Sequence, residues 1–204
     1  VLFRSYIPKE NKKVEVNNKY HSYTIDSYDR LHISWAANAL PNEFNLDDVY
    51  YPRLNKIWYS GTISNVGVCE NYSNFAPFIE ECFKNNIDFI CNDPWQNPLT
   101  DEQVKKRTMN SILGVDIRGP ELLRNGYIPC RVFKSISWGH LGITNSEETY
   151  KELEGNVLYQ PDTRQLFYDA MEKRLDYDFI KQSMLYIQEN HTYVNRVNNI
   201  MSIL

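Results

Sequence analysis

The sequence predicts an α/β fold with a doubly wound parallel sheet, preceded by a shorter N-terminal segment. From about residue 53 onward, short apolar runs alternate with helical patterns of about ten residues, which is typical of βαβ units. The 204 residues suffice for one domain and part of a second. The first 52 residues are mostly polar and irregular and stand outside this alternation.

The N-terminal segment contains one clear apolar run. Residues 9–30 are rich in Lys, Asn, Tyr and Ser and predict a loop or hairpin. Leu31–Ala37 predicts a short buried strand. Asn38–Asp48 contains Pro41 and predicts a turn followed by a loop.

Pro52 and Arg53 mark the predicted boundary between two parts of the chain. We expect residues 1–52 to be a remnant of a partner domain with its linker, and residues 53–204 to form the α/β unit. The chain begins with Val1 and has no signal-peptide pattern. The expectation is therefore a cytoplasmic chain that lacks its natural start.

Five apolar runs predict the strands of the sheet. Each has about four to six residues and is followed within three residues by Gly, Asn or Pro. The carboxyl ends of parallel strands share one edge of a sheet, and ligands bind outside that edge near a topological switch point. The predicted strands are Lys56–Tyr59, Ile87–Cys91, Ile112–Ile117, Leu141–Thr144 and Asn156–Tyr159.

Helical patterns fill the intervals between these runs. Apolar side chains recur three and four residues apart from Phe75 to Phe83, with Pro77 tolerated in the first turn. Thr100 before Asp101 and Glu102 predicts a helix N-cap. The predicted helices are Asn74–Asn86, Asp101–Asn110, Cys130–Trp138, Ser146–Gly155, Asp162–Arg174 and Asp178–Ser202.

Composition and charge exclude several classes of protein. Hydrophobic residues make up 42% and charged residues 24%, and the net charge is −4. No apolar run is long enough for a transmembrane segment, and no excess of basic residues indicates a nucleic-acid partner. The cysteines match no zinc or haem spacing, so reduced structural thiols are expected; they are Cys69, Cys82, Cys91 and Cys130.

Two candidate ligand contacts follow predicted strands directly. Gly61, in Ser60-Gly61-Thr62, would let a ligand approach the backbone, although a simple turn explains it equally well. The full glycine fingerprints of dinucleotide and P-loop sites are absent. Arg118 would be a bidentate donor to an anion, and the alternative is a surface ion pair with Asp116.

The stretch from Arg124 to Lys134 is the most informative part of the sequence. Gly126 and Pro129 make a turn that leads directly into a helix, whose N-terminus offers free N–H groups. Arg131 and Lys134 lie one turn apart and add two cations. This combination suits a diphosphate, and the alternative is a solvated basic helix face.

Other catalytic patterns are missing from the sequence. The four histidines show no metal-ligand spacing, and there is no Gly-x-Ser-x-Gly elbow. Paired glutamates such as Glu147-Glu148 suit a solvated helix face. Trp58, Trp95 and Trp138 are candidates for stacking on a base or sugar, with core packing favoured for Trp58.

Three segments in order resemble the C-terminal, donor-binding domain of GT-B-fold glycosyltransferases, in the branch related to spore-maturation proteins. Pro129–Gly139 and Leu141–Asn145 resemble the donor-site helix and the following strand. Gly155–Tyr159 with Leu166-Phe167 is similar to the next strand and helix, and His191–Val197 to the closing His-Thr-Tyr-x-x-Arg helix. The resemblance covers about residues 53–204.

The resemblance implies a Rossmann-like C-terminal half of a GT-B fold and transfer of a sugar from a nucleotide sugar to a glycan or other acceptor. Residues 1–52 would then belong to the acceptor-side domain. Gly61 would lie near the phosphates, Tyr127 and Ile128 would flank the base, and Arg131 would hold the diphosphate leaving group. No metal or cofactor is expected, and the chain would supply mainly the donor-binding half of the enzyme. The implied donor contacts are Gly61, Thr62, Arg118, Tyr127, Ile128, Arg131, Lys134 and Ser135.

One departure from the family pattern concerns the donor. Where the family commonly has a Glu that contacts the ribose, this chain has Lys134. A cation cannot accept a hydrogen bond from a hydroxyl, but it suits a phosphate or a sugar that carries a carboxylate. Two alternatives stay open: a catalytically silent binding module, and a flavodoxin-like or receiver-type domain with Asp93 or Asp116 as weak phosphoacceptor candidates.

Overall fold

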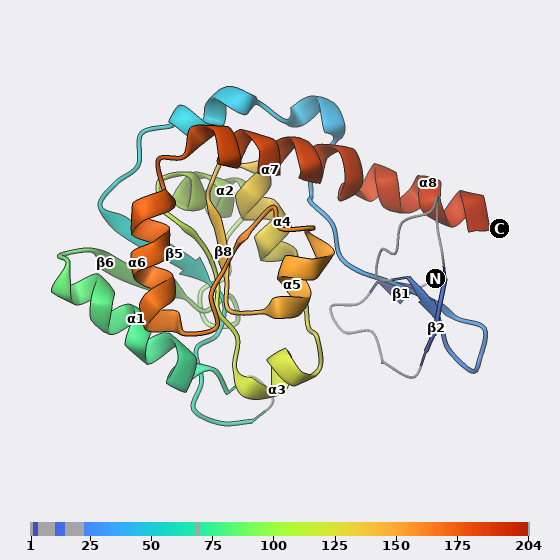
Figure 1. The fold of residues 1–204 in the computed structure, drawn as a ribbon, viewed down its shortest axis with the longest axis horizontal. Helices are drawn as coiled ribbons and strands as arrows, with labels where there is room; N and C mark the ends of the chain where they lie inside the picture. The colour runs from blue at the N-terminus through green and yellow to red at the C-terminus, as the bar shows by residue number, and fades with distance from the viewer. Residues whose placement is uncertain (1, 4–10, 15–22, 68–69, 204) are drawn as a thin grey trace.

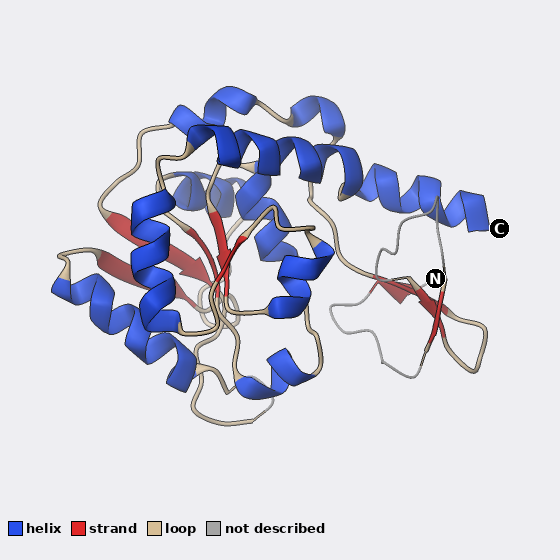
Figure 2. Ribbon diagram, in the orientation of Figure 1, coloured by secondary structure: helices blue, strands red, loops and turns tan. Residues whose placement is uncertain are grey.

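The computed structural model describes residues 2–3, 11–14, 23–67 and 70–203. It confirms an α/β unit with parallel strands and helices (Figures 1 and 2). β5 pairs with β6, and β7, β8 and β9 pair in sequence order, all in parallel. These strands are β5 (Lys56–Ser60), β6 (Asp88–Asn92), β7 (Gly114–Asp116), β8 (Gly142–Thr144) and β9 (Leu158–Tyr159).

Buried Ser111 and its neighbour join the two groups of strands. The N–H of Ile112 donates to the carbonyl of Lys56 at 3.0 Å. The Ser111 hydroxyl accepts from the N–H of Trp58 and donates to the carbonyl of Leu113. β7 therefore lies beside β5, which places the pair β6-β5 next to the group β7-β8-β9. The chain leaves β5 toward β6 and then returns past it to β7, which makes the β5–β7 border the topological switch point.

Helices cover both faces of the strands. Because β-α-β crossovers are right-handed, the helix lies on one face when the chain moves along the strands in one direction and on the other face when it moves back. α1 packs against α6, while α2 contacts β5 and α4 contacts β7 and β8. The long α7 crosses over α4. The helices of this unit are α1 (Tyr72–Lys84), α2 (Asp101–Met109), α3 (Pro120–Arg124), α4 (Cys130–Ser137), α5 (Glu147–Glu152), α6 (Thr163–Lys173) and α7 (Tyr177–Asn190).

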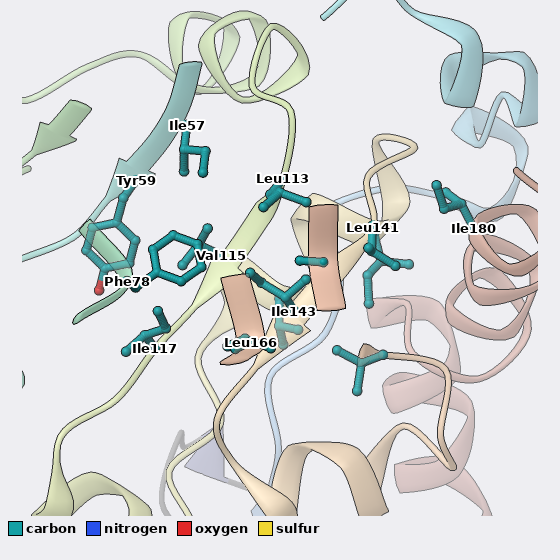
Figure 3. Close-up of a cluster of buried hydrophobic side chains, with 14 of the residues drawn as sticks. Ile57, Tyr59, Phe78, Leu113, Val115, Ile117, Leu141, Ile143, Leu166 and Ile180 are labelled. Atoms are coloured by element: carbon teal, nitrogen blue, oxygen red, sulfur yellow. The ribbon is translucent and has the colours of Figure 1, made fainter. Parts of the chain in front are cut away.

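One apolar core holds this unit together. Alternate side chains of the strands point to opposite faces, so each face of the sheet meets its own helices. Figure 3 shows the central part of this core. Its fully or almost fully buried members include Ile57, Phe78, Leu113, Val115, Ile117, Ile143 and Leu166.

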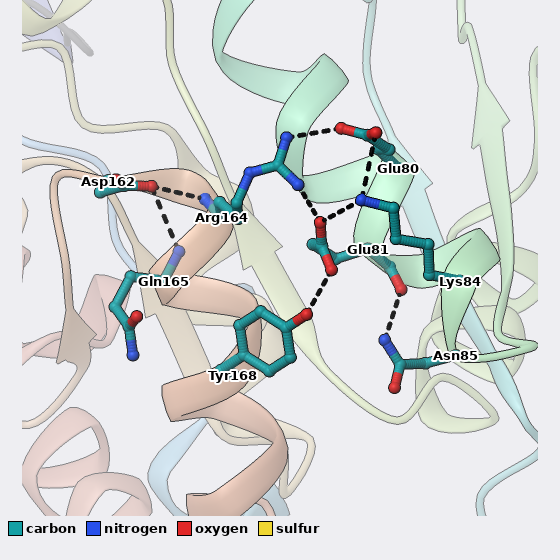
Figure 4. Close-up of polar contacts among 8 residues, drawn as sticks. All are labelled: Glu80, Glu81, Lys84, Asn85, Asp162, Arg164, Gln165 and Tyr168. Carbon is teal, nitrogen blue, oxygen red and sulfur yellow. Dashed lines mark hydrogen bonds and ion pairs between the residues drawn. The ribbon is translucent and has the colours of Figure 1, made fainter.

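A cluster of charged side chains around the buried Glu81 adds to the contact between α1 and α6 (Figure 4). Glu81 of α1 is only 2% exposed and pairs with Arg164, Lys84 and the hydroxyl of Tyr168. Arg164 reaches Glu80 as well. These partners compensate the negative charge of Glu81 and occupy its carboxylate oxygens, so the side chain can be buried.

The N-terminal residues form a second, smaller sheet in the order β1-β4-β3-β2. A small cluster of Tyr23, Leu31 and Ile33 packs there against Ile200 and Ile203 of α8. Figure 1 shows α8 running from the α/β unit to this sheet. The elements are β1 (Leu2–Phe3), β2 (Lys12–Lys13), β3 (Thr24–Ile25), β4 (Leu31–Ile33) and α8 (Tyr193–Ile203).

Several predicted boundaries are wrong. The loop expected over Asn38–Asp48 contains the 3-10 helices η1 (Pro41–Glu43) and η2 (Leu46–Tyr50). α1 begins at Tyr72, two residues before the predicted start, so Pro77 lies inside the helix. The short helix α3 is an element that the sequence pattern did not predict.

The single helix predicted over Asp178–Ser202 is two helices. Thr192 interrupts it: the hydroxyl of Thr192 accepts from the N–H of Asn195, and the Asn195 side chain accepts from the N–H of Thr192 at 2.8 Å. These reciprocal bonds start α8 anew. Within the described residues, no helix is both long enough and apolar enough to cross a membrane.

The cysteines were expected to be reduced structural thiols. Cys82 is buried, Cys130 half-buried and Cys91 exposed, and all three are free thiols. Burial raises the pKa of Cys82 to about 12, so this thiol stays protonated and inert at neutral pH. Cys69 lies outside the described residues.

Candidate functional site

The carboxyl ends of β5 and β7 bring several of the predicted ligand contacts together. Tyr59 and Ser60 end β5, and Gly61 continues it by donating its N–H to the carbonyl of Asn92 at 2.9 Å. Asp116 ends β7. The N-terminus of α4 lies over this border and carries Arg131 in its first turn.

Arg131 is the central cation of the site. Its guanidinium carbon lies 4.6 Å from the centre of the Tyr59 ring, within the range of a cation–π interaction. Among the described residues, no carboxylate lies within ion-pair distance of this guanidinium. Arg131 thus presents a half-buried positive charge with an aromatic neighbour in place of a counter-ion.

Gly61 lets Arg131 take this position. A Cβ atom at residue 61 would lie 2.5 Å from a guanidinium nitrogen of Arg131 and 2.9 Å from the Tyr59 ring. A side chain at residue 61 would therefore displace the flexible end of Arg131, and glycine permits this close approach. Its own N–H is already used within the sheet, so Gly61 shapes the site without offering that donor to a ligand.

The protonation states of the two partners follow from burial and charge. Burial raises the pKa of Tyr59 above its ordinary value, so its hydroxyl stays neutral. Burial alone would lower the pKa of Arg131, but Tyr59 and Asp116 outweigh this and raise it. The guanidinium is charged at every pH at which the protein is folded.

The first turn of α4 adds further donors. Its N-cap residue is Pro129, and no side chain in the described part of the protein caps the first-turn amides. The amides and the positive end of the helix dipole favour an anion there. They lie beside Arg131, so cation and helix end act on the same region.

A cavity of about 40 Å³ lies next to Arg131, between α2, α4 and the sheet. Lys134 and Ser135, two of the predicted donor contacts, line it. The ammonium of Lys134 lies 3.9 Å from the exposed carboxylate of Asp101 at the start of α2. The lining residues are Trp58, Tyr59, Ser60, Val104, Thr108, Val115, Arg131, Lys134, Ser135 and Trp138.

Arg118 has a different position from the one expected of a ligand contact. It is 2% exposed, and its guanidinium donates to both oxygens of Asp116. It also bonds the hydroxyls of Ser146 and Thr149. These bonds link β7 to the start of α5 and occupy most of the donors of Arg118. The ion pair with Asp116 is thus the alternative that the sequence offered, except that the pair is buried and not at the surface.

The remaining predicted contacts are spread around this edge. Ile128 is 5% exposed and belongs to the core. The half-buried ring of Tyr127 lies 5.9 Å from the guanidinium carbon of Arg118, and the hydroxyl of Thr62 donates to Asp93 at 3.4 Å. The site therefore groups Gly61, Arg131, Lys134 and Ser135.

Two residues that line the site escaped sequence reasoning. Tyr59 and Ser60 were assigned to a strand and its turn, yet both border Arg131 and the cavity. The position of both at the carboxyl end of the first strand was the available signal.

The two Asp residues considered as phosphoacceptors of a receiver-type site both have hydrogen-bond partners within the protein. Asp116 is held by Arg118 and accepts from the Thr144 hydroxyl at 3.0 Å. Asp93 accepts from the N–H of Trp95 at 2.9 Å. In the described part of the chain, no group of three His, Cys, Asp or Glu side chains is placed to hold a metal ion.

Comparisons with known proteins assign this chain to no family. No model of a protein family matches the sequence, and neither the curated proteins nor the solved structures that were searched include a match.

Proposed function

We propose that this chain binds a nucleotide-sugar donor and is the donor-binding part of a metal-independent glycosyltransferase with a GT-B fold. The acceptor is a glycan or another nucleophile. The observation that carries the proposal is the half-buried guanidinium of Arg131, which has no carboxylate within ion-pair distance among the described residues. A charge of this kind is stabilised by an anionic ligand.

Three features support a diphosphate as that anion. Arg131 lies at the switch point of a parallel sheet, where ligands of α/β folds bind. The N-terminus of α4 adds amide donors on the same side. Gly61 keeps side-chain atoms away from the guanidinium.

The proposed role of Arg131 is to stabilise the leaving group. Breaking the bond between sugar and diphosphate leaves negative charge on the β-phosphate oxygens. Donors that are already in place stabilise this charge more in the transition state than in the bound donor. The catalytic base and most acceptor contacts would come from the acceptor-side domain.

A thermal-shift screen tests the binding step. UDP, GDP, dTDP and their sugars are added to the wild-type chain and to Arg131→Ala. A ligand at 100 times its Kd stabilises by about 2.7 kcal/mol, or about 5–10 °C for a chain of this size. We expect at least one nucleotide to give such a shift, and Arg131→Ala to remove it.

Lys105→Ala is the matched control, because it removes one exposed positive charge from α2 that is not part of the cavity lining. Its shift should equal that of the wild type. A nucleotide shift that survives in Arg131→Ala would contradict the proposed position of the diphosphate. Binding without donor hydrolysis or sugar transfer in the presence of acceptors would favour a silent binding module.

A further inference from the structure

Trp58 forms part of the wall of the cavity between α2 and α4. It is 8% exposed and lines the cavity. Its indole N–H is buried and has no acceptor among the residues that the structure describes. Trp58 therefore contributes its aromatic ring to the wall, and hydrogen bonds to a ligand come from other lining residues.

The same cavity is positively charged. Arg131 and Lys134 line it, and none of its lining residues is acidic. The nearest acidic partner of Lys134 in the described ranges is Asp101, whose side chain is 94% exposed and 3.9 Å away. A contact that long with so exposed a carboxylate is weak, and an oxyanion inside the cavity would compete with it effectively.

Hydroxyl groups and aromatic rings complete the lining. Ser135 and Thr108 are each 7% exposed and supply neutral donors. Trp138 borders the cavity as well. The guanidinium of Arg107 lies 4.8 Å from the ring of Trp58 and adds a third positive charge behind it.

Size restricts what can enter. A bound water needs about 10–15 Å³ of such volume, so the cavity of about 40 Å³ holds about three water-sized positions. This space matches a single carboxylate or phosphate group. The cavity would thus receive one charged substituent of a larger ligand that lies outside it.

We propose that this cavity is a second anion subsite, which binds an oxyanion substituent of the donor other than its diphosphate. Lys134 and the Ser135 hydroxyl bind this group, while Arg131, which also borders the cavity, binds the diphosphate. The inference rests on the proposed donor site. The oxyanion is a carboxylate on the sugar or a phosphate on the ribose, and both present the same acceptor oxygens.

Matched ligand pairs test the subsite by calorimetry on the full chain. For the sugar, UDP-glucose is compared with UDP-glucuronate and GDP-mannose with GDP-mannuronate. For the ribose, UMP is compared with uridine 3′,5′-bisphosphate and AMP with adenosine 3′,5′-bisphosphate. Inorganic pyrophosphate, compared between the wild type and Arg131→Ala, reports on the diphosphate site.

The member with the extra oxyanion should bind at least tenfold more tightly in one type of pair. Lys134→Gln should reduce this preference to about twofold. Lys105→Gln is the control and should preserve the full preference.

The outcomes separate the subsite from the donor site. Equal affinity for both members of every pair, with binding still dependent on Arg131, overturns the subsite and leaves the donor site standing. A preference that is unchanged in Lys134→Gln also overturns the subsite. If pyrophosphate and all nucleotides fail to bind the folded wild-type chain, both proposals are wrong.

Discussion

Gly61 and Arg131 show how one missing side chain creates a charged site. A Cβ atom at residue 61 would lie 2.5 Å from a guanidinium nitrogen of Arg131, so Gly61→Ala should push Arg131 away from Tyr59. We expect binding of pyrophosphate or of any nucleotide from the screen to weaken by about tenfold or more, since one charge-assisted contact contributes about 1.5–3 kcal/mol. Calorimetry measures the loss.

Gly67→Ala is the control for the general effect of replacing a glycine. Gly67 has a positive φ of 75°, and a Cβ added there would meet no described atom within 4 Å. The substitution should cost about 1 kcal/mol of stability through the backbone and leave anion affinity unchanged. Equal losses of affinity in both variants would show that Arg131 does not depend on Gly61.

The buried His140 should make the stability of the fold depend on pH. It is 1% exposed, and its ring nitrogens lie 3.1 Å from the carbonyl of Ser111 and 3.3 Å from that of Ser135. Burial, with a contribution from the positive charge of Arg53, lowers its pKa from 6.5 to about 3. The folded protein therefore holds a neutral imidazole where the unfolded chain would bind a proton.

Because the unfolded state binds the extra proton, this group destabilises the fold as pH falls. Its contribution is fully favourable above pH 6.5 and is lost progressively down to about pH 3. In urea unfolding, the stability of wild type relative to His140→Gln should fall by up to about 1.4 kcal/mol per pH unit in this window. Parallel pH profiles for the two proteins would refute the assignment.

At the scale of elements, Arg164 of α6 binds the buried carboxylate of Glu81 and so links α6 to α1. Removing one partner of a buried ion pair leaves the other charge uncompensated. Arg164 is itself 44% exposed, which moderates the effect, and Lys84 and Tyr168 still bind Glu81. We expect Arg164→Met to lower the free energy of unfolding, by less than the loss of a fully buried ion pair would.

A double variant tests the cause. Arg164→Met with Glu81→Leu removes both charges and should recover most of the loss, because it leaves no unpaired carboxylate at residue 81. Chemical unfolding of the single and double variants measures the coupling. Strictly additive losses would mean that the two residues act independently.

The sequence predicted the strands of the α/β unit better than its helix boundaries. Strands such as Lys56–Ser60 are short, apolar and bounded by turn residues, so their pattern has one interpretation. The break at Thr192 was missed because the apolar pattern continues across it. The signal was local: Thr192 with Asn195 three residues later resembles a capping box with an amide in place of Glu or Gln.

The candidate site was only partly predictable, because several of its contacts join residues that are far apart in the sequence. Arg131 and Lys134 could be placed on one helix face from their spacing alone. The role of Arg118 depends on Ser146 and Thr149, which lie about 30 residues away in the chain, and no local pattern encodes this contact. The Trp58 N–H lacks an acceptor among the described residues because of how α2 and α4 pack, which again is tertiary information.

At the scale of the whole molecule, Arg196 joins the two sheets. It is fully buried at the start of α8. Its guanidinium donates to the carbonyls of Ser34, Trp35 and Asn190. The N–H of Ala37 also donates to the carbonyl of His191 at 2.7 Å. One side chain thus holds the segment after β4, the end of α7 and the beginning of α8 together.

Arg196→Met should therefore separate the stability of the two sheets. The carbonyls that Arg196 now satisfies would lose charged donors in a buried position, at a cost of about 3 kcal/mol. We expect faster amide hydrogen exchange in β3, β4 and α8, while β5 and β8 keep their protection and the anion site keeps its affinity. Asn198→Ala, an exposed change on the same helix, should leave exchange unaltered. Uniformly faster exchange in both sheets would show instead that the small sheet and the α/β unit unfold as one cooperative structure.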